Sequence, residues 1–238
     1  MFYKIAECVT ECTPMYAMAK ERMKPYEAED GKEDFKIGFS EEFLRQRQSE
    51  NPHLTQEQCE YIYLTDRFYK KLLLHGGMML HASAVTVDDR AYLFSAKSGT
   101  GKSTHTKQWQ KLFGSHRAEI LNDDKPALRR TEDGWFAYGT PFSGKTDENQ
   151  NKKVRLQGIC MLERGVENHI ERMDAACAIP LLMRQSILPR NEEMAGNLMQ
   201  MLDQLLREVS IWRMQCNIST EAAAMAYHAM RAESGIRE

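Results

Sequence analysis

The stretch from Tyr92 to Gln108, YLFSAKSGTGKSTHTKQ, constrains the chain more than any other segment. An apolar run leads into a turn of small residues with two glycines, and a Lys-Ser pair then opens a segment that can be helical. Glycines in such a turn let successive backbone N–H groups point at an anion, because a Cβ would block the approach. The helix adds its unpaired N–H groups and the positive end of its dipole. This layout is typical of a phosphate-binding loop.

We expect the core of this motif, SGTGKST, to bind the phosphates of a nucleotide. Lys102 would reach the outer phosphates, and the Ser103 hydroxyl would ligate Mg²⁺. The full motif has its first glycine at position 96, where this chain has Ala96. A glycine-rich β-turn that happens to contain Lys-Ser is the alternative interpretation. The expected phosphate-binding residues are Ser98, Gly99, Thr100, Gly101, Lys102, Ser103 and Thr104.

Two adjacent acids, Asp123 and Asp124, follow a short strand expected over 118–121. Carboxylates are hard oxygen ligands that suit Mg²⁺. One of the pair could hold the metal while the other takes the proton from an attacking hydroxyl. We place the metal on Ser103 and Asp124, but the sequence does not decide which carboxylate acts as the base. The alternative is an Asx-rich turn, which the letters NDDKP also allow.

Two further features can contribute to the same site. His81 is a polar residue inside a strand expected over 78–87, which turns at 88–90 into a returning strand over 91–95. It is either a site residue or a core histidine bonded to the backbone. The letters TPFSGK and the polar run over 146–153 suggest a mobile loop over a substrate, and a plain surface loop is equally compatible. The expected substrate-facing residues are Ser143, Gly144, Lys145 and Arg155.

The rest of the chain predicts a mixed β-sheet core with flanking helices and a helical C-terminal part. Residues 1–52 are expected to form a β-rich segment packed on a domain over 53–238, with strands at 2–9 and 35–39 and a charged loop at 27–33. Thr55 and Gln58 predict a capping box that opens a helix ending near residue 74. The remaining elements are expected as helices over 105–113, 175–187, 192–209 and 220–232, a hairpin of strands 126–130 and 135–139, an apolar and central strand over 154–163, and strands over 170–173 and 210–216.

Composition excludes several classes of protein. The formal net charge of −2 argues against a dedicated nucleic-acid-binding protein. No apolar run reaches the ~20 residues that span a bilayer. Glu7 and Glu11 interrupt the N-terminal apolar sequence, so no signal-peptide pattern is present and a cytoplasmic protein is expected. The six cysteines are scattered without zinc-binding spacing, which favours reduced, mostly buried thiols.

A strand with His (LHASAV), then SGTGKST, then a strand ending in Asp-Asp resembles the HPr kinase/phosphorylase group, whose P-loop fold is shared with phosphoenolpyruvate carboxykinase. In that group a His-containing strand pairs with the strand before the phosphate loop, and His81 matches it. The paired acids of the group match Asp123 and Asp124; one is implied to bind Mg²⁺ and the other to act as general acid/base. The GTPFSGK stretch and the helical tail resemble shorter HPr-kinase-related proteins, some of which act in peptide-modification gene clusters. The resemblance covers roughly Leu80 to the C-terminal end.

The chain also departs from this group, because it has Ala96 and lacks the long glycine-rich segment that engages a protein substrate. The leading hypothesis is ATP- and Mg²⁺-dependent phosphoryl transfer to a hydroxyl of a peptide, a protein or a small molecule. A nucleotide-binding regulatory or scaffold protein without transfer activity is the alternative. A GTPase is less compatible, since no N-K-x-D motif is present. The acceptor, the oligomeric state and the choice among ATP, GTP and pyrophosphate stay open.

Overall fold

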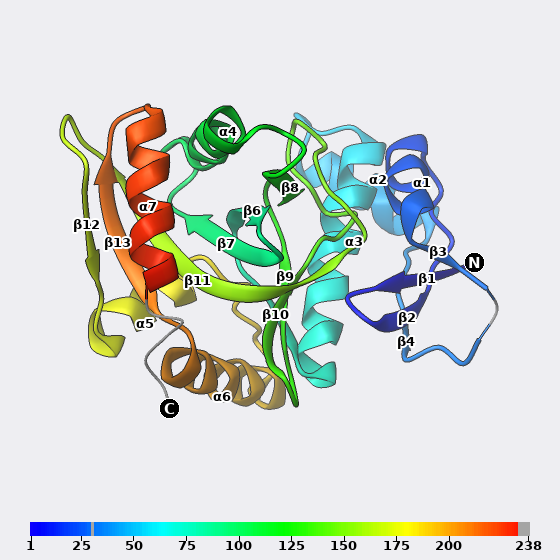
Figure 1. Ribbon diagram of the computed structural model, residues 1–238. Coiled ribbons are helices and arrows are strands. Elements are labelled where there is room, and N and C mark those ends of the chain that lie inside the picture. Colours follow the sequence, from blue (N-terminus) through cyan, green and yellow to red (C-terminus); the bar gives the residue numbers. More distant parts are fainter. Residues whose placement is uncertain (30, 233–238) are drawn as a thin grey trace.

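The computed structural model describes residues 1–29 and 31–232. Within these residues a curled mixed sheet of nine strands has helices on both faces, and a sheet of four strands lies at one end (Figure 1). The four-stranded sheet is ordered β3 (Glu27–Ala28), β1 (Phe2–Ile5), β2 (Cys8–Glu11) and β4 (Phe35–Lys36). The path of the larger sheet is β5 (Gly77–Met79), β9 (Ala127–Thr131), β10 (Gly134–Tyr138), β11 (Lys153–Arg164), β7 (Arg90–Ser95), β6 (Ala82–Val87) and β8 (Glu119–Asn122).

The centre of the larger sheet is β11, as the apolar sequence predicts. One side of β11 pairs with β7 in parallel, from Arg155 opposite Arg90 to Met161 opposite Ser95. Its first residues pair with β10, and its last six pair in parallel with β13 (Ile211–Cys216), which in turn pairs with β12 (His169–Arg172). Parallel neighbours end at the same edge of a sheet, so the chain segments that follow β7, β11 and β13 lie close together.

Alternation along the strands gives the sheet two buried faces. On β7, Tyr92 and Phe94 pack on one face against Trp109 and Tyr227, whereas Leu93 belongs to the core of the opposite face. The first face is covered by α4 (Lys102–Phe113) and α7 (Thr220–Ala232), and the second by α5 (Ala175–Arg184) and α6 (Glu192–Glu208).

A long helix, α3 (Gln56–Leu72), packs its buried side into the core of the small sheet. Its predicted capping box is confirmed, because Thr55 Oγ1 accepts from Gln58 N at 3.1 Å and Gln58 Oε1 accepts from Thr55 N at 2.9 Å. Two short 3₁₀ turns, η1 (Lys24–Tyr26) and η2 (Leu73–His75), connect neighbouring elements.

The N-terminal part differs from the sequence-based prediction. One strand over 2–9 is wrong, because the chain reverses at Ala6 and Glu7 (φ 49° and 64°) to form the β1–β2 hairpin. This turn lacks the Asn or Gly that usually marks such a reversal. The strand expected over 35–39 is confined to Phe35–Lys36. Two helices that were not predicted are α1 (Ala17–Met23) and α2 (Glu41–Glu50).

Most other predicted elements are confirmed to within a few residues. Part of the charged loop expected over 27–33, residue 30, lies outside the described residues. The β6–β7 hairpin turns at Asp88 and Asp89, both with left-handed φ, and the strands of the β9–β10 hairpin lie within one residue of the expected bounds. No helix in the described residues has the length and apolarity to cross a membrane. Four of the cysteines are buried, Cys216 is half-buried and Cys177 is exposed, all as free thiols.

Candidate active site

The candidate phosphate loop, Ser95–Thr104, connects the end of β7 to the first turn of α4. Gly99 and Gly101 have φ of 78° and 120°, in the region that favours glycine. Ala96 is buried, with 7% of its surface exposed, and does not share this positive φ. Alanine therefore fits at position 96 without backbone strain, although the full motif has a glycine there.

Lys102 is the first residue of α4, and its side chain is buried beside the loop. Its Nζ lies 3.3 Å from the Ala96 carbonyl oxygen and 3.1 Å from His81 Nε2. Burial lowers the pKa of Lys102, and the charge of Asp124 acts in the opposite direction. The lysine expected to bind phosphate and the candidate site histidine are therefore brought into contact.

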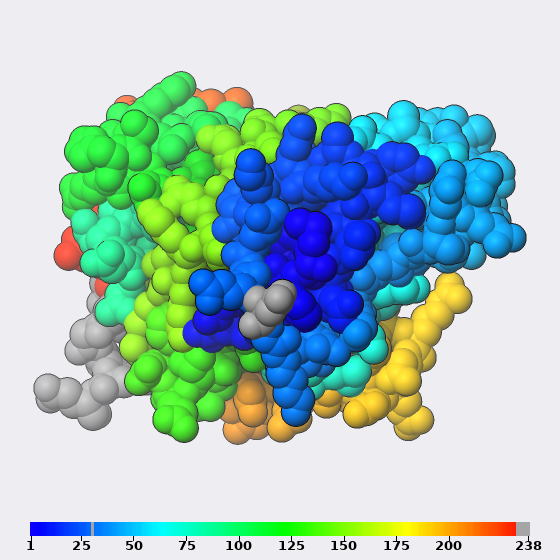
Figure 2. All heavy atoms as spheres, turned by 90° about the vertical axis from the view of Figure 1, so that its right-hand side faces the viewer, coloured from blue at the N-terminus to red at the C-terminus, as the bar shows by residue number. Residues whose placement is uncertain are grey.

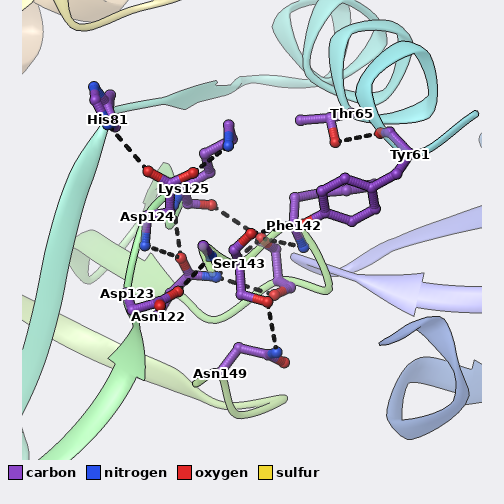
Figure 3. Close-up of polar contacts among 12 residues, drawn as sticks. Tyr61, Thr65, His81, Asn122, Asp123, Asp124, Lys125, Phe142, Ser143 and Asn149 are labelled. Carbon is purple, nitrogen blue, oxygen red and sulfur yellow. Dashed lines mark hydrogen bonds and ion pairs between the residues drawn. The ribbon is translucent and has the colours of Figure 1, made fainter. Parts of the chain in front are cut away.

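His81 reaches this position because the strand expected over 78–87 is interrupted. The chain leaves the sheet between β5 and β6, where the His81 N–H donates to Gln185 O at 2.7 Å and the Ser95 hydroxyl donates to His81 O at 2.8 Å. The ring faces Asp124, with Nε2 3.0 Å from Asp124 Oδ1 (Figure 3). Its other nitrogen, Nδ1, lies 2.9 Å from Gln185 Oε1. The ring thus contacts three polar side chains besides the backbone contacts of its own residue.

Asp124 follows β8 and forms an ion pair with Lys125 as well as its contact to His81. Burial raises the pKa of Asp124, but His81 and Lys125 outweigh burial and lower the pKa to about 2. The carboxylate is therefore ionised at neutral pH. Asn122 Oδ1 accepts from the N–H groups of Asp124 and Lys125 at 3.0 and 2.7 Å, so the segment is also an Asx turn.

Asp123 faces a different partner, although it adjoins Asp124. One carboxylate oxygen accepts from Gly144 N at 2.5 Å, and the other accepts from the Thr146 hydroxyl. A Cβ on Gly144 would lie 3.0 Å from Asp123 Oδ2, so the close approach depends on glycine. Asp124 thus faces His81, which contacts Lys102, whereas Asp123 faces the segment that follows β10.

That segment, residues 140–152, is anchored along its length. Arg22 donates to the carbonyl oxygens of Ser143 and Gly144 at 3.1 and 3.2 Å, and the Tyr61 hydroxyl donates to Ser143 O at 2.7 Å. Ser143 is buried and its hydroxyl donates to Asp147, whereas Lys145 is exposed. Figure 2 shows the N-terminal segment packed against this region. Figure 3 shows Tyr61 beside Ser143. These contacts describe an anchored surface loop with an exposed tip.

Arg155 lies far from the candidate site. It pairs with Arg90 at the beginning of β7, whereas the phosphate loop follows Ser95 at its end. Arg90 and Ser95 are five residues apart along the strand, about 17 Å. The expected role of Arg155 near a substrate is not supported by this placement, because the sequence pattern did not reveal that β11 runs parallel to β7.

A cavity of about 590 Å³ adjoins the phosphate loop where β7, β11 and β13 end together. Its lining includes Gly101, Thr104, Leu162, Arg164, Cys216 and Ile218. Arg164 Nε donates to Thr100 O at 3.2 Å, and the same guanidinium donates to Gly99 O. His105, another lining residue, is buried against Phe94, and burial lowers its pKa to about 4. A partly apolar cavity, lined by the neutral His105 and by the charged Glu163 and Arg164, therefore continues from the glycines of the loop.

Sequence reasoning did not identify Gln185, Arg164, Lys125 or Arg22. Lys125 and Arg164 had a usable signal, since each follows a buried strand close to the expected phosphate loop. Gln185 and Arg22 had none, because each depends on how a distant helix packs.

The oxygen donors near the loop fit Mg²⁺ but do not form a preformed cage. Among residues 1–29 and 31–232, no three His, Cys, Asp or Glu side chains lie together in a metal-binding arrangement. Mg²⁺ in nucleotide sites commonly uses one or two protein oxygens together with phosphates and water. Asp124 and the Ser103 hydroxyl are oxygen donors of that kind, and the Asp124 oxygens already contact His81 and Lys125.

No protein-family model matches the chain, and no curated protein matches it in sequence. Among solved structures, the HPr(Ser) kinase/phosphatase from Coxiella burnetii superposes with a TM-score of 0.36 and 9% sequence identity. The superposition covers 65% of this chain and 98% of that one. A likeness this remote does not assign the chain to a family.

Proposed function

We propose that this chain transfers a phosphoryl group from ATP to a hydroxyl group of an acceptor. The observation that carries the proposal is the contact of Lys102 Nζ with His81 Nε2, 3.1 Å apart, beside a glycine turn that opens a helix. Buried cations and helix N-termini both stabilise phosphate, and the adjoining carboxylates supply the other groups that phosphoryl transfer needs.

The phosphates would occupy the loop from Ser98 to Thr104, and the nucleoside would enter the adjoining cavity. About 590 Å³ is within the 300–1,000 Å³ range of small-molecule sites. Gly101 and Thr104 belong to both the loop and the cavity lining, so one ligand can span them. Arg164 keeps the loop carbonyls directed away from the phosphates and adds a positive charge at this end of the sheet.

Ser103 and Asp124 would hold Mg²⁺, which when bound would neutralise charge on the phosphates. A carboxylate with a pKa of about 2 suits a cation ligand better than a proton acceptor at neutral pH. Asp123 is then the better base. Its Oδ2 already accepts from the Thr146 hydroxyl, which the hydroxyl of the acceptor would replace.

In the reaction, the acceptor oxygen bonds to the γ-phosphorus as the bond from that phosphorus to the bridging oxygen of ADP breaks. The hydroxyl proton passes to Asp123. Lys102 and the loop N–H groups stabilise the charge on the phosphoryl oxygens. His81 keeps Lys102 beside the loop, and the 140–146 segment, bonded to Asp123, would contact the acceptor.

Binding can be tested by thermal unfolding with ATP, ADP, GTP and pyrophosphate, each with and without Mg²⁺. Ligand at about 100 times its Kd stabilises by about 2.7 kcal/mol, which raises Tm by about 5–10 °C in a chain of this size. Lys102→Ala should abolish the shift. Lys111→Ala, which removes an exposed lysine from the same helix, should preserve it. A flat wild-type response to every nucleotide rejects the proposal.

Transfer can then be tested with labelled ATP and peptides containing Ser or Thr. Asp123→Asn and Asp124→Asn should each reduce transfer at least a hundredfold, while Asp123→Asn should retain the nucleotide-induced Tm shift. Nucleotide binding with no phosphorylated acceptor, and with no effect of either substitution, would instead identify the regulatory or scaffold alternative.

A further inference from the structure

The cavity beside the phosphate loop extends across the ends of three neighbouring strands. β7, β11 and β13 run parallel and side by side, with β11 in the middle (Figure 1). Gly101 belongs to the loop after β7, Leu162 to β11, and Asn217 to the segment after β13, and all three line the cavity. Two strand spacings separate the outer strands, about 10 Å. A nucleotide with its phosphates on the loop would therefore direct its base toward Asn217.

Asn217 is held at both its backbone and its side chain by the turn that follows β11. Its backbone N–H donates to Asn168 Oδ1 at 3.0 Å, and its side-chain Nδ2 donates to Val166 O at 3.1 Å. A backbone carbonyl oxygen only accepts hydrogen bonds, so the NH₂ group of Asn217 has to face Val166 and Oδ1 has to face away. Within residues 1–29 and 31–232, no donor is bonded to Asn217 Oδ1. The side chain thus presents a fixed acceptor that a ligand can use.

Other lining groups near this amide oxygen are apolar or already bonded. Ile218 is 75% exposed, and contact with a flat base would remove its apolar surface from water. His105 Nε2 accepts from the indole N–H of Trp109 at 3.3 Å. The Glu163 carboxylate belongs to the middle strand and lies 3.4 Å from Arg213 Nε. The amide oxygen is thus a neutral acceptor at the end of the cavity away from the phosphate loop.

We propose that Asn217 selects the base of the donor nucleotide, because its Oδ1 accepts from the exocyclic amino group of adenine. A base with a carbonyl oxygen at that position, such as hypoxanthine or guanine, would place two acceptors against each other. A site that hydrogen-bonds one group of a ligand rejects the analogue without that group, since the partner is then left unpaired beneath the ligand. The resulting preference for ATP over GTP rests on the proposed function, because it needs phosphates bound at the loop.

Four ligands isolate this contact when each is titrated with Mg²⁺ in a calorimeter. ATP carries the amino group, purine riboside triphosphate lacks it, inosine triphosphate has an oxygen in its place, and tripolyphosphate has no base. Asn217→Leu replaces the amide by an apolar side chain of similar size. Gln215→Leu is the matched control, since it removes an exposed amide from the same strand end without changing the cavity lining. The ratio of two Kd values within one protein cancels a general loss of phosphate binding.

In wild type and Gln215→Leu, the Kd for ATP should be about tenfold lower than the Kd for either analogue, as one hydrogen bond allows. In Asn217→Leu the three nucleotides should bind within about twofold of one another, and the Kd for tripolyphosphate should not change. Equal Kd values for the three nucleotides in wild type, or an unchanged ratio in Asn217→Leu, would overturn the role of Asn217 while leaving phosphate binding intact. If wild type binds neither ATP nor tripolyphosphate, the proposed function fails and the role of Asn217 fails with it.

Discussion

The guanidinium of Arg22 donates to Ser143 O at 3.1 Å, so a helix near the N-terminus holds a loop that follows β10. The same side chain donates to Gly144 O at 3.2 Å and pairs with Asp147 at 3.2 Å. It is only 14% exposed and lies over the ring of Tyr61. Because Gly144 N is bonded to Asp123, the N-terminal part and a candidate catalytic carboxylate share one loop.

Replacing Arg22 with Ala should therefore loosen this loop. We expect the free energy of unfolding to fall by about 2 kcal/mol, since buried carbonyls lose charged donors. Amide hydrogen exchange at Gly144 should accelerate more than exchange in β7 or β11. Arg45→Ala, which removes an exposed arginine 3.9 Å from Glu41, should change stability by less than about 0.5 kcal/mol. Equal exchange at Gly144 in wild type and Arg22→Ala would contradict the coupling.

The ionisation of Asp124 should contribute to stability in acid. A pKa lowered to about 2 means that the carboxylate stabilises the folded chain above the unfolded value of about 3.9. This contribution, about 2 kcal/mol, is lost as pH falls through the folded value. Urea unfolding between pH 6 and pH 2 should thus show a steeper decline below pH 4 for wild type than for Asp124→Asn. Asp133→Asn, in an exposed turn, should follow the wild-type curve; parallel curves for wild type and Asp124→Asn would refute the assignment.

Arg164 and Arg155 occupy opposite ends of β11 and make a matched pair. Arg164→Ala should raise the Kd for Mg-ATP about tenfold, equivalent to about 1.4 kcal/mol, because the loop carbonyls lose their donor. Arg155→Ala removes the same charge nine residues along the strand, about 30 Å away, and should leave the Kd within twofold. Calorimetric titration of both variants checks this. Similar losses in the two variants would indicate a general charge effect instead of loop support.

Gly139 should not tolerate a side chain. A Cβ at this position would lie 1.8 Å from Gln150 O and 2.7 Å from Leu121 O, both backbone atoms. Gly139→Ala should therefore destabilise by about 3 kcal/mol in chemical denaturation. Gly196→Ala is the control: nothing lies within 4 Å of its Cβ position, and in the helix α6 it should stabilise by up to about 1 kcal/mol. A neutral Gly139→Ala would show that the 140–152 loop is free to move from β8.

The local patterns in this chain predict local structure well. The capping box at Thr55, the glycines at 99 and 101, and the apolar run of β11 each depend on neighbours in sequence. The β1–β2 hairpin was missed because Ala6 and Glu7 adopt left-handed φ without a residue type that signals it.

For the candidate site, the sequence indicates residue types but not which of them contact one another. Asp123 and Asp124 are adjacent, yet one faces Gly144 and the other faces His81. Their division depends on where the 140–146 segment and the end of α5 pack, and no local pattern encodes either contact. Arg155 was expected near the substrate because it follows the 140–152 loop in sequence. It lies instead beside Arg90, at the end of β7 opposite the phosphate loop, because β11 runs parallel to β7.

The 140–152 loop also covers the outer edge of β8. Asp123 N donates to Glu148 O and Gln150 N donates to Leu121 O, each at 3.0 Å, so residues 148–150 occupy the hydrogen-bonding groups of an edge strand. An uncovered edge is a template for pairing with another chain. Displacing this loop from β8 would expose those groups to a strand of a second copy, so variants that release the loop should form concentration-dependent oligomers.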